Sequence, residues 1–283
     1  MKLQSKTNLK RIFFRPFSLF FAFILMPINY LIPQAFDFIL FRKTTINISD
    51  TEGSISHRDF GPDSRSVAKG SLLKEPSTII WLNSFIKNKS LLDIGASVGV
   101  FSLYAAKIME AEVVALEPNA PAFSLLCLNI NDNNLGKKIT PYPLAASSTE
   151  GFSSLFMTGL KADAGGSSFE QPIDARGELY EPDFIQGTYS ICLDSLLNKH
   201  SSFDYVKIDT DGNEIKVLKG MSKILSSTNL KSMLIELNEN SEEYAKIISL
   251  IQSYGFVLDE EITKMSYISL KRGGRIYNHI FNK

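Results

Sequence analysis

From about residue 77 onward, short apolar runs typical of β-strands alternate with amphipathic segments typical of α-helices. Successive parallel strands need crossover connections, so this alternation predicts an α/β fold: a mostly parallel sheet with helices on both faces. We expect the last two strands to close the sheet in antiparallel orientation. The predicted strands are residues 91–94, 112–117, 139–145, 204–209, 231–237, 255–258 and 266–270. The predicted helices are residues 100–109, 121–131, 213–225 and 242–253.

The first 43 residues differ from the rest, because basic residues flank an uncharged apolar run at 16–36. The run is long enough for a membrane-spanning helix, but Pro27 and Pro33 interrupt it. Four interpretations compete: a membrane-associated or re-entrant hairpin, a single span, a helix packed on the domain, and a cleaved signal peptide. We expect an apolar helical extension that contacts a membrane through residues 12–41 without crossing it.

Two further segments are rich in turn-forming residues. Residues 44–76 are polar and predict an irregular connector with one short strand. Residues 146–188 are rich in Gly, Ser and Asp and predict an insertion made of a hairpin and a mobile loop. The main domain therefore spans residues 77–283, with the insertion inside it.

The charge balance and the cysteine count exclude several classes. Thirty basic and thirty acidic residues give a net charge of zero, whereas non-specific nucleic-acid binding needs a basic surface. The two cysteines form no CxxC pair and the three histidines are far apart in sequence, which argues against a zinc site. We expect neither nucleic acid nor a structural metal as a partner.

A glycine-containing turn follows the first predicted strand. In a doubly wound sheet, ligands bind beyond the carboxyl ends of the strands. Gly95 and Gly99 allow a tight turn there and let a ligand approach the backbone. The helix that begins directly afterwards offers free amides. Such turns are also common for structural reasons, so this signal is weak on its own.

The second predicted strand ends in Glu117, which lies 24 residues after Asp93. A carboxylate at this place can accept hydrogen bonds from both hydroxyls of an adenosine ribose. Together with the glycine turn, it predicts an adenosine-type pocket. This pair of features does not separate S-adenosylmethionine from NAD.

Later strand ends favour S-adenosylmethionine. Asp209, Asp211 and Glu236 follow or end later strands, and no arginine or second glycine cluster near the first turn could hold a pyrophosphate. A cleft lined by carboxylates attracts a sulfonium cation and repels a pyrophosphate.

The combination of motifs resembles the FkbM-type methyltransferases, a family of Rossmann-like S-adenosylmethionine-dependent enzymes. The matching segments are residues 92–99 (LDIGASVG), 116–119 (LEPN), 193–196 (LDSL), 206–214 (VKIDTDGNE) and 234–236 (LIE). The resemblance covers about residues 77–260 and implies a class I methyltransferase fold with a seven-stranded sheet. The chain departs mildly from the family pattern at three positions: Ser97 replaces Asn, Asp211 replaces Glu, and Asn213 replaces a frequent His.

The resemblance also implies roles in cofactor binding. Asp93 and the turn from Gly95 through Ser97 to Gly99 would hold the methionine end, and Glu117 would bind the ribose. Asn119 would lie near the adenine, and Ala145 and Ala146 would line its face. Asp209 would close the pocket beneath the methionine amino group and face the acceptor. For Asp194, a direct role and a structural hydrogen bond at a turn are equally compatible with the sequence.

Methyl transfer to a neutral hydroxyl benefits from a base that accepts its proton. Asp209 is the leading candidate for this base, with Asp211 and Glu214 as alternatives. A second route places a divalent cation between Asp209 and Glu236.

The sequence thus predicts an S-adenosylmethionine-dependent O-methyltransferase whose acceptor is a hydroxyl of a sugar, a glycan or a related metabolite. Because the cofactor is made in the cytosol, we expect a cytoplasmic enzyme with possible attachment to a membrane. One rival class is an NAD-dependent oxidoreductase or epimerase, and a Tyr-x-x-x-Lys pair suited to it is not convincingly placed. The other is a non-catalytic, methyltransferase-like binding module.

Overall fold

The computed structural model describes residues 42–47, 54–59, 75–160, 167–266 and 275–283. The chain divides into two compact units, Met1–Arg42 and Lys43–Lys283. Apart from Arg42, the described residues belong to the second unit. The predicted apolar extension and its membrane contact through residues 12–41 lie outside the described ranges. Each helix within those ranges is too short or too polar to span a bilayer.

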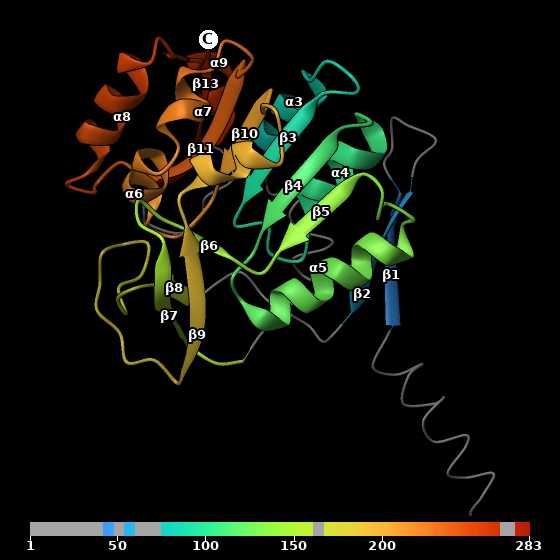
Figure 1. The fold of residues 1–283 in the computed structure, drawn as a ribbon, viewed down its shortest axis with the longest axis horizontal. Helices are drawn as coiled ribbons and strands as arrows, with labels where there is room; N and C mark the ends of the chain where they lie inside the picture. The colour runs from blue at the N-terminus through green and yellow to red at the C-terminus, as the bar shows by residue number, and fades with distance from the viewer. Residues whose placement is uncertain (1–41, 48–53, 60–74, 161–166, 267–274) are drawn as a thin grey trace, which may run out of the picture. The chain divides into compact units, whose positions relative to one another are not determined.

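A seven-stranded sheet forms the centre of the second unit, as the sequence predicts (Figure 1). In spatial order its strands are β12 (Val257–Leu258), β13 (Ile276–Asn282), β11 (Ser232–Asn238), β10 (Tyr205–Ile208), β3 (Ser90–Ile94), β4 (Glu112–Leu116) and β5 (Ile139–Tyr142). β11, β10, β3, β4 and β5 run parallel, whereas β13 is antiparallel to both of its neighbours.

The register of the parallel strands aligns their carboxyl ends. Ile208 in β10 lies opposite Ile94 in β3 and Ile235 in β11. The residues that come next on these strands and on β4 therefore form one row along the carboxyl edge of the sheet. This row contains Gly95, Glu117, Asp209 and Glu236.

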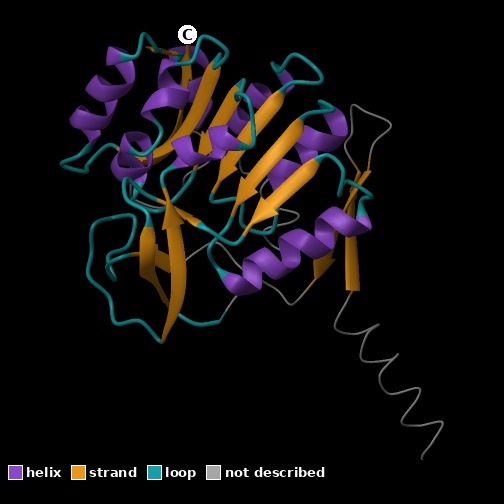
Figure 2. Ribbon diagram, in the orientation of Figure 1, coloured by secondary structure: helices purple, strands orange, loops and turns teal. Residues whose placement is uncertain are grey.

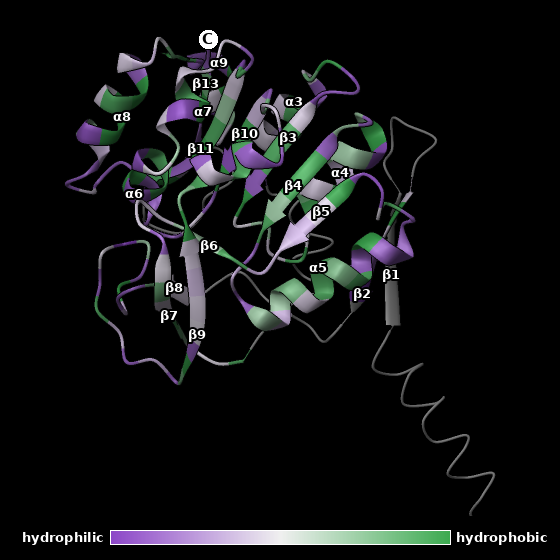
Figure 3. Ribbon diagram, viewed as in Figure 1, coloured by the Kyte–Doolittle hydropathy of each residue, from purple (hydrophilic) through white to green (hydrophobic). Residues whose placement is uncertain are grey.

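Helices cover both faces of the sheet (Figure 2). Those that pack on one face are α3 (Pro76–Asn83), α4 (Val100–Ile108), α5 (Ala120–Asp132) and α9 (Glu260–Ser266). Those on the other face are the 3-10 helix η1 (Leu193–Asn198), α6 (Glu214–Lys219), α7 (Ser222–Ser226) and α8 (Tyr244–Ser253). The central strands are buried from both sides, so they are apolar runs, as the colouring of β4 illustrates (Figure 3).

The insertion folds into a second sheet beyond the carboxyl ends of β4 and β5 (Figure 1). Its strands are β6 (Ala145–Ala146), β9 (Phe184–Ile191), β7 (Gly151–Met157) and β8 (Ser167–Phe169). The long antiparallel pairing of β7 with β9 is the predicted hairpin. The predicted strand at 139–145 ends at Tyr142 in the main sheet, and Ala145 belongs instead to β6. The sequence did not indicate β6 and β8 as separate strands.

The region predicted as a connector contains two strands where one was expected. β1 (Arg42–Asn47) and β2 (Ser54–Asp59) pair with each other, and β2 docks on α5. The backbone amide of Ser56 donates to the side-chain oxygen of Asn133, the C-cap residue of α5, at 3.0 Å, and that of Arg58 donates to Asn129 in α5 at 2.8 Å. Polar side chains of α5 and its C-cap thus accept hydrogen bonds from backbone amides of β2. The periodicity of a strand sequence does not reveal this kind of pairing.

Only the first residue of the predicted closing strand at 266–270 lies within the described ranges. Ser266 ends α9, residues 267–270 lie outside the described ranges, and the closing antiparallel strand is β13 at Ile276–Asn282. The predicted helix at 213–225 is divided into α6 and α7 at Gly220. A Cβ at Gly220 would lie 2.1 Å from the carbonyl oxygen of Ser147, so the close approach of these two segments requires glycine there.

Candidate active site

A cavity opens at the carboxyl edge of the main sheet, and the insertion sheet covers it. The main sheet contributes the segments that follow β3, β4 and β10, and the insertion contributes apolar and hydroxyl side chains from β7 and β8. The lining comprises Ile94, Gly95, Leu116–Asn119, Ala122, Leu144–Ala146, Leu155, Ser167, Phe169, Asp209–Asp211 and Asn213.

The turn after β3 requires glycine at two places. Gly95 has φ 77°, and a Cβ there would lie 1.8 Å from the carbonyl oxygen of Asp209. Gly99 has φ 90°, and a Cβ there would lie 2.5 Å from Cδ1 of Leu126. Ser97, between them, also has a positive φ of 50°. The turn is therefore held tightly against the segment after β10, with its amides directed toward the end of β4.

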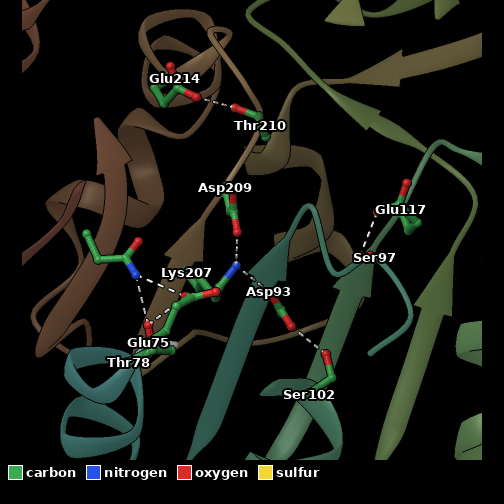
Figure 4. Close-up of polar contacts among 11 residues, drawn as sticks. Glu75, Thr78, Asp93, Ser97, Ser102, Glu117, Lys207, Asp209, Thr210 and Glu214 are labelled. Atoms are coloured by element: carbon green, nitrogen blue, oxygen red, sulfur yellow. Dashed lines mark hydrogen bonds and ion pairs between the residues drawn. The ribbon is translucent and has the colours of Figure 1, made fainter. Parts of the chain in front are cut away.

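Glu117 accepts two backbone hydrogen bonds, one of them from this turn. Its Oε2 accepts from the amide of Ser97 at 2.7 Å (Figure 4), and its Oε1 accepts from the amide of Asn119 at 2.8 Å. The side chain is buried, and burial raises its pKa to about 7 despite the two amides. A carboxylate has about four lone-pair sites, so each oxygen keeps acceptor capacity for a ligand in the cavity.

Two asparagines fix the walls near Glu117. The side chain of Asn119 accepts from the amide of Ala122 at 3.1 Å and caps α5, so Asn119 is held at the helix start. Asn213 donates from Nδ2 to the carbonyl oxygen of Ala146 at 2.8 Å. This bond holds β6 against the segment after β10 and fixes the apolar wall formed by Ala145 and Ala146.

Asp93 lies beneath the cavity and is not among the residues that line it. Its side chain is 1% exposed, its Oδ2 accepts from the hydroxyl of Ser102 at 2.5 Å, and its Oδ1 lies 3.9 Å from Nζ of Lys207. Lys207 in turn donates to Oδ2 of Asp209 at 2.8 Å (Figure 4). A buried cation therefore connects Asp93 to the rim of the cavity.

Three carboxyl groups gather on the opposite side from Glu117. Oxygens of Asp209, Asp211 and Glu236 lie within 4.8 Å of one another, close enough for the three to ligate one cation. Burial and repulsion by Asp209 raise the pKa of both Asp211 and Glu236 well above the usual range. Asp211 has a φ of 53°, a left-handed conformation that Asp tolerates better than most residues.

Two other acids named by the sequence have structural partners. Oε1 of Glu214 accepts from Oγ1 of Thr210 at 3.1 Å and from the amide of Gly212 at 2.9 Å, so it braces the turn that presents Asp209 and Asp211. Asp194 accepts from the amides of Lys223 and Ile224 at the start of α7. Of the two interpretations of Asp194, the geometry favours the structural one.

The structure thus brings most of the predicted site residues together. Gly95, Glu117, Asn119, Asp209 and Asp211 line one cavity. Ser97 and Gly99 shape its turn, and Asp93 lies below it.

The sequence analysis missed two participants. Lys207 was quoted only as part of a motif, although a lysine between Val206 and Ile208 in a buried strand is itself a signal of a buried charge. Glu75, at the start of α3, lay in the predicted connector.

The cavity suits the adenosine and amino-acid ends of S-adenosylmethionine. Oγ of Ser97 is buried and has no hydrogen-bond partner in the described part of the chain, beside a carboxylate with acceptor capacity. Buried polar atoms of this kind are normally satisfied, so the Ser97 hydroxyl has hydrogen-bonding capacity to spare. Fold and cavity together define the class: a Rossmann-like methyltransferase that uses S-adenosylmethionine.

Comparison with known proteins gives the family. The model of the methyltransferase FkbM domain matches residues 93–258. The chain belongs to the FkbM methyltransferase family. This membership confirms the resemblance to FkbM-type methyltransferases seen in the motifs. It favours methyl transfer over the NAD-dependent interpretation.

One curated relative and two solved structures illustrate the similarity. The relative is the hexuronic acid methyltransferase AglP of Haloferax volcanii, 29% identical over 180 residues, which are 62% of this chain and 66% of that one. The chain thus spans slightly less than two thirds of this relative's length. A precorrin-6y C5,15-methyltransferase of Geobacter metallireducens is 11% identical, with TM-score 0.42 and coverage of 73% and 86%. TrmK of M. capricolum, in complex with S-adenosylhomocysteine, is 11% identical, with TM-score 0.40 and coverage of 73% and 67%.

Proposed function

We propose that the protein transfers the methyl group of S-adenosylmethionine to a hydroxyl of a sugar, a glycan or a related metabolite. The observation that carries this proposal is the group of carboxyls at Asp209, Asp211 and Glu236, which borders the cofactor cavity. A neutral hydroxyl needs a proton acceptor, and such a group provides one in a partly buried place. The hexuronic acid named for the relative AglP supports a sugar as the acceptor class.

In this proposal the cofactor lies along the carboxyl edge of the sheet. Glu117 accepts the ribose hydroxyls, Asn119 and the wall at Ala145 and Ala146 flank the adenine, and the turn at Gly95 faces the methionine part. When bound, S-adenosylmethionine supplies an electrophilic methyl group. The chain's own contribution is alignment of the acceptor oxygen, which can reduce the barrier by roughly 7–11 kcal/mol.

The geometry favours Asp211 over Asp209 as the proton acceptor. Oδ2 of Asp209 is held by the ammonium of Lys207 at 2.8 Å, and a proton on this carboxyl would weaken the ion pair. Asp211 has a raised pKa, which makes its ionised form a stronger proton acceptor than an ordinary carboxylate. Asp209 then orients ligands and Asp211 receives the hydroxyl proton.

The test is methylation of defined acceptors, measured by mass spectrometry as a gain of one methyl group. Neutral and uronic-acid-containing oligosaccharides serve as the two acceptor sets. Asp211→Asn should reduce turnover by about 10²–10⁴-fold while S-adenosylhomocysteine affinity stays within about threefold. Asp183→Asn, at an exposed position in the insertion, is the matched control. Full turnover in Asp211→Asn would remove this residue as the base.

Two further outcomes separate the alternatives. Loss of turnover with EDTA and its recovery with Mg²⁺ would show that the carboxyls of Asp209, Asp211 and Glu236 bind a cation and do not act as the base. A protein that binds S-adenosylhomocysteine but methylates neither acceptor set would support the non-catalytic binding module.

We also propose that the enzyme works in the cytoplasm and contacts a membrane through residues 12–41. The support is the apolar composition of this segment and its flanking basic residues. A chain without residues 1–41 should move from the membrane fraction to the soluble fraction. Equal fractionation of both forms would contradict the proposed contact.

A further inference from the structure

Lys207 places a positive charge in the interior of the protein. Its side chain is 2% exposed and lies one residue before the carboxyl end of β10. The ammonium is 2.8 Å from Oδ2 of Asp209, 3.9 Å from Oδ1 of Asp93, and 5.4 Å from the centre of the Phe101 ring (Figure 4). An ammonium so placed has lost nearly all of its hydrating water. The neighbouring carboxylates take the place of that water.

A third acid belongs to the same network. Oε2 of Glu75 accepts from Oγ1 of Thr78 and from Nδ2 of Asn278, both at 3.0 Å (Figure 4). Burial raises the pKa of both Glu75 and Asp93, and the charge of Lys207 opposes this rise. Acids from the start of α3, from β3 and from the end of β10 therefore converge on one cation.

Fold stability does not require such a network. Burying an ion pair costs desolvation energy that its attraction often fails to recover, and apolar replacements of similar volume are frequently as stable. The position of Lys207, in a strand whose other residues are buried and apolar, would suit an aliphatic side chain. Instead, Lys207 supplies a fixed positive charge beneath Asp209, which lines the cavity.

Asp209 is the member of the network that reaches the cavity. Its side chain is 30% exposed and lines the cavity, whereas Asp93 and Lys207 are enclosed. Lys207 occupies Oδ2 of Asp209, which leaves Oδ1 for a ligand. We propose that Lys207 is a positioning residue that fixes the Asp209 carboxylate so that its second oxygen meets the amino group of the cofactor's methionine part.

This inference rests on the proposed contact between Asp209 and the cofactor, and it does not depend on the acceptor. Without Lys207, the Asp209 carboxylate loses the 2.8 Å contact that fixes its Oδ2. A reoriented Asp209 would no longer present its second oxygen to the cofactor's ammonium group.

The experiment compares two ligands by isothermal titration. S-adenosylhomocysteine contains the amino group, and 5′-methylthioadenosine contains the nucleoside and sulfur without the amino acid. Lys207→Met should weaken S-adenosylhomocysteine binding by about ten- to a hundredfold, the loss of a charge-assisted contact. Binding of 5′-methylthioadenosine should change by less than about twofold, because its contacts lie toward Glu117. Lys264→Met, at an exposed surface ion pair, is the control and should change neither affinity.

Lys207→Met leaves two buried carboxyls without a cation, so its folding is checked by circular dichroism. If it does not fold, Lys207→Met combined with Asp93→Asn removes one of these charges and is compared with Asp93→Asn alone. Partial recovery of S-adenosylhomocysteine affinity in Lys207→Arg would support a role for the charge.

Equal losses for both ligands in Lys207→Met would show a structural role and overturn the proposal. Unchanged or tighter binding of S-adenosylhomocysteine would overturn it as well. Absence of binding of either ligand to the parent protein would instead refute the proposed cofactor contacts themselves, so the two failures are distinguishable.

Discussion

Glu117 is a buried carboxyl whose two oxygens already accept backbone hydrogen bonds from Ser97 and Asn119. Those bonds orient the carboxylate but do not replace the hydration lost on burial, so its pKa rises to about 7. The group therefore changes charge within the physiological range. Its strength as an acceptor of ribose hydroxyls depends on pH for the same reason.

We expect S-adenosylhomocysteine affinity to increase as the pH rises through about 7, because Glu117 is then ionised. Glu117→Gln should bind more weakly by about 1.5–3 kcal/mol at pH 8. The ratio of variant to parent Kd should grow by up to about tenfold between pH 6 and pH 8. Titration calorimetry at both pH values measures this ratio. A ratio of one at both would remove Glu117 from the site.

The acids at strand ends were predictable at the scale of single residues. Glu117 and Asp209 follow short apolar strands, and parallel strands end at one edge. The role of Lys207 and the buried hydroxyl of Ser97 were not predictable in the same way. The partners of Lys207 come from segments up to 132 residues away, such as Glu75, and only the fold brings them together. The unpartnered hydroxyl of Ser97 likewise depends on local backbone geometry.

The segment from β10 to α7 shows how elements are fixed by distant contacts. α7 has five residues, which is too short to be stable alone. Its first amides, at Lys223 and Ile224, donate to Asp194 in η1, and the hydroxyl of Ser222 does the same at 3.1 Å. Asp194 therefore acts as the cap of a helix that begins 28 residues later in the chain.

Asp194→Ala should destabilise the protein by about 0.5–2 kcal/mol, the usual effect of losing a helix cap. Asp194→Asn retains an acceptor oxygen and should recover part of this loss. Urea denaturation of the three proteins measures the difference, with S-adenosylhomocysteine affinity expected to stay unchanged. A fall in affinity without loss of stability would point to a direct role in the site.

The main elements were predictable from sequence because each matches one periodicity. The buried strands β3 and β4 and the helix α5 were found close to their observed bounds. The insertion sheet was only half predicted, because β6 and β8 have two and three residues and depend on pairing with β9 and β7. β13 was missed because its sequence, IYNHIFN, mixes apolar and polar residues without clear alternation.

At the scale of the whole molecule, a neutral protein holds a strongly acidic site. The net charge is zero, yet Asp93, Asp211, Glu214 and Glu236 have raised pKa values, as Glu117 does. Because these groups bind protons in the folded state at pH values where the unfolded chain has released them, the free energy of unfolding falls as the pH rises.

The protein without cofactor should therefore be less stable at pH 8 than at pH 6. For Glu117 alone, a pKa that rises from 4.5 to about 7 on folding corresponds to on the order of 3 kcal/mol in total, of which about 1.4 kcal/mol is lost between pH 6 and pH 8. Differential scanning calorimetry at both pH values measures the effect, and Glu117→Gln should reduce it. At pH 8, S-adenosylmethionine should raise the Tm more than S-adenosylhomocysteine, because its sulfonium adds a positive charge. Equal Tm values at pH 6 and pH 8 in the parent would contradict this expectation.

The position of β13 between β11 and β12 has a consequence for how the protein is made. β12 joins the sheet through β13, which leaves the ribosome later. Until residue 282 has emerged from the exit tunnel, β11 presents one open edge, and β12 has no place in the sheet. An open strand edge attracts other chains. Nascent copies of this enzyme should therefore be vulnerable to aggregation between the synthesis of β11 and the emergence of β13, when a chaperone that shields β11 would be most useful.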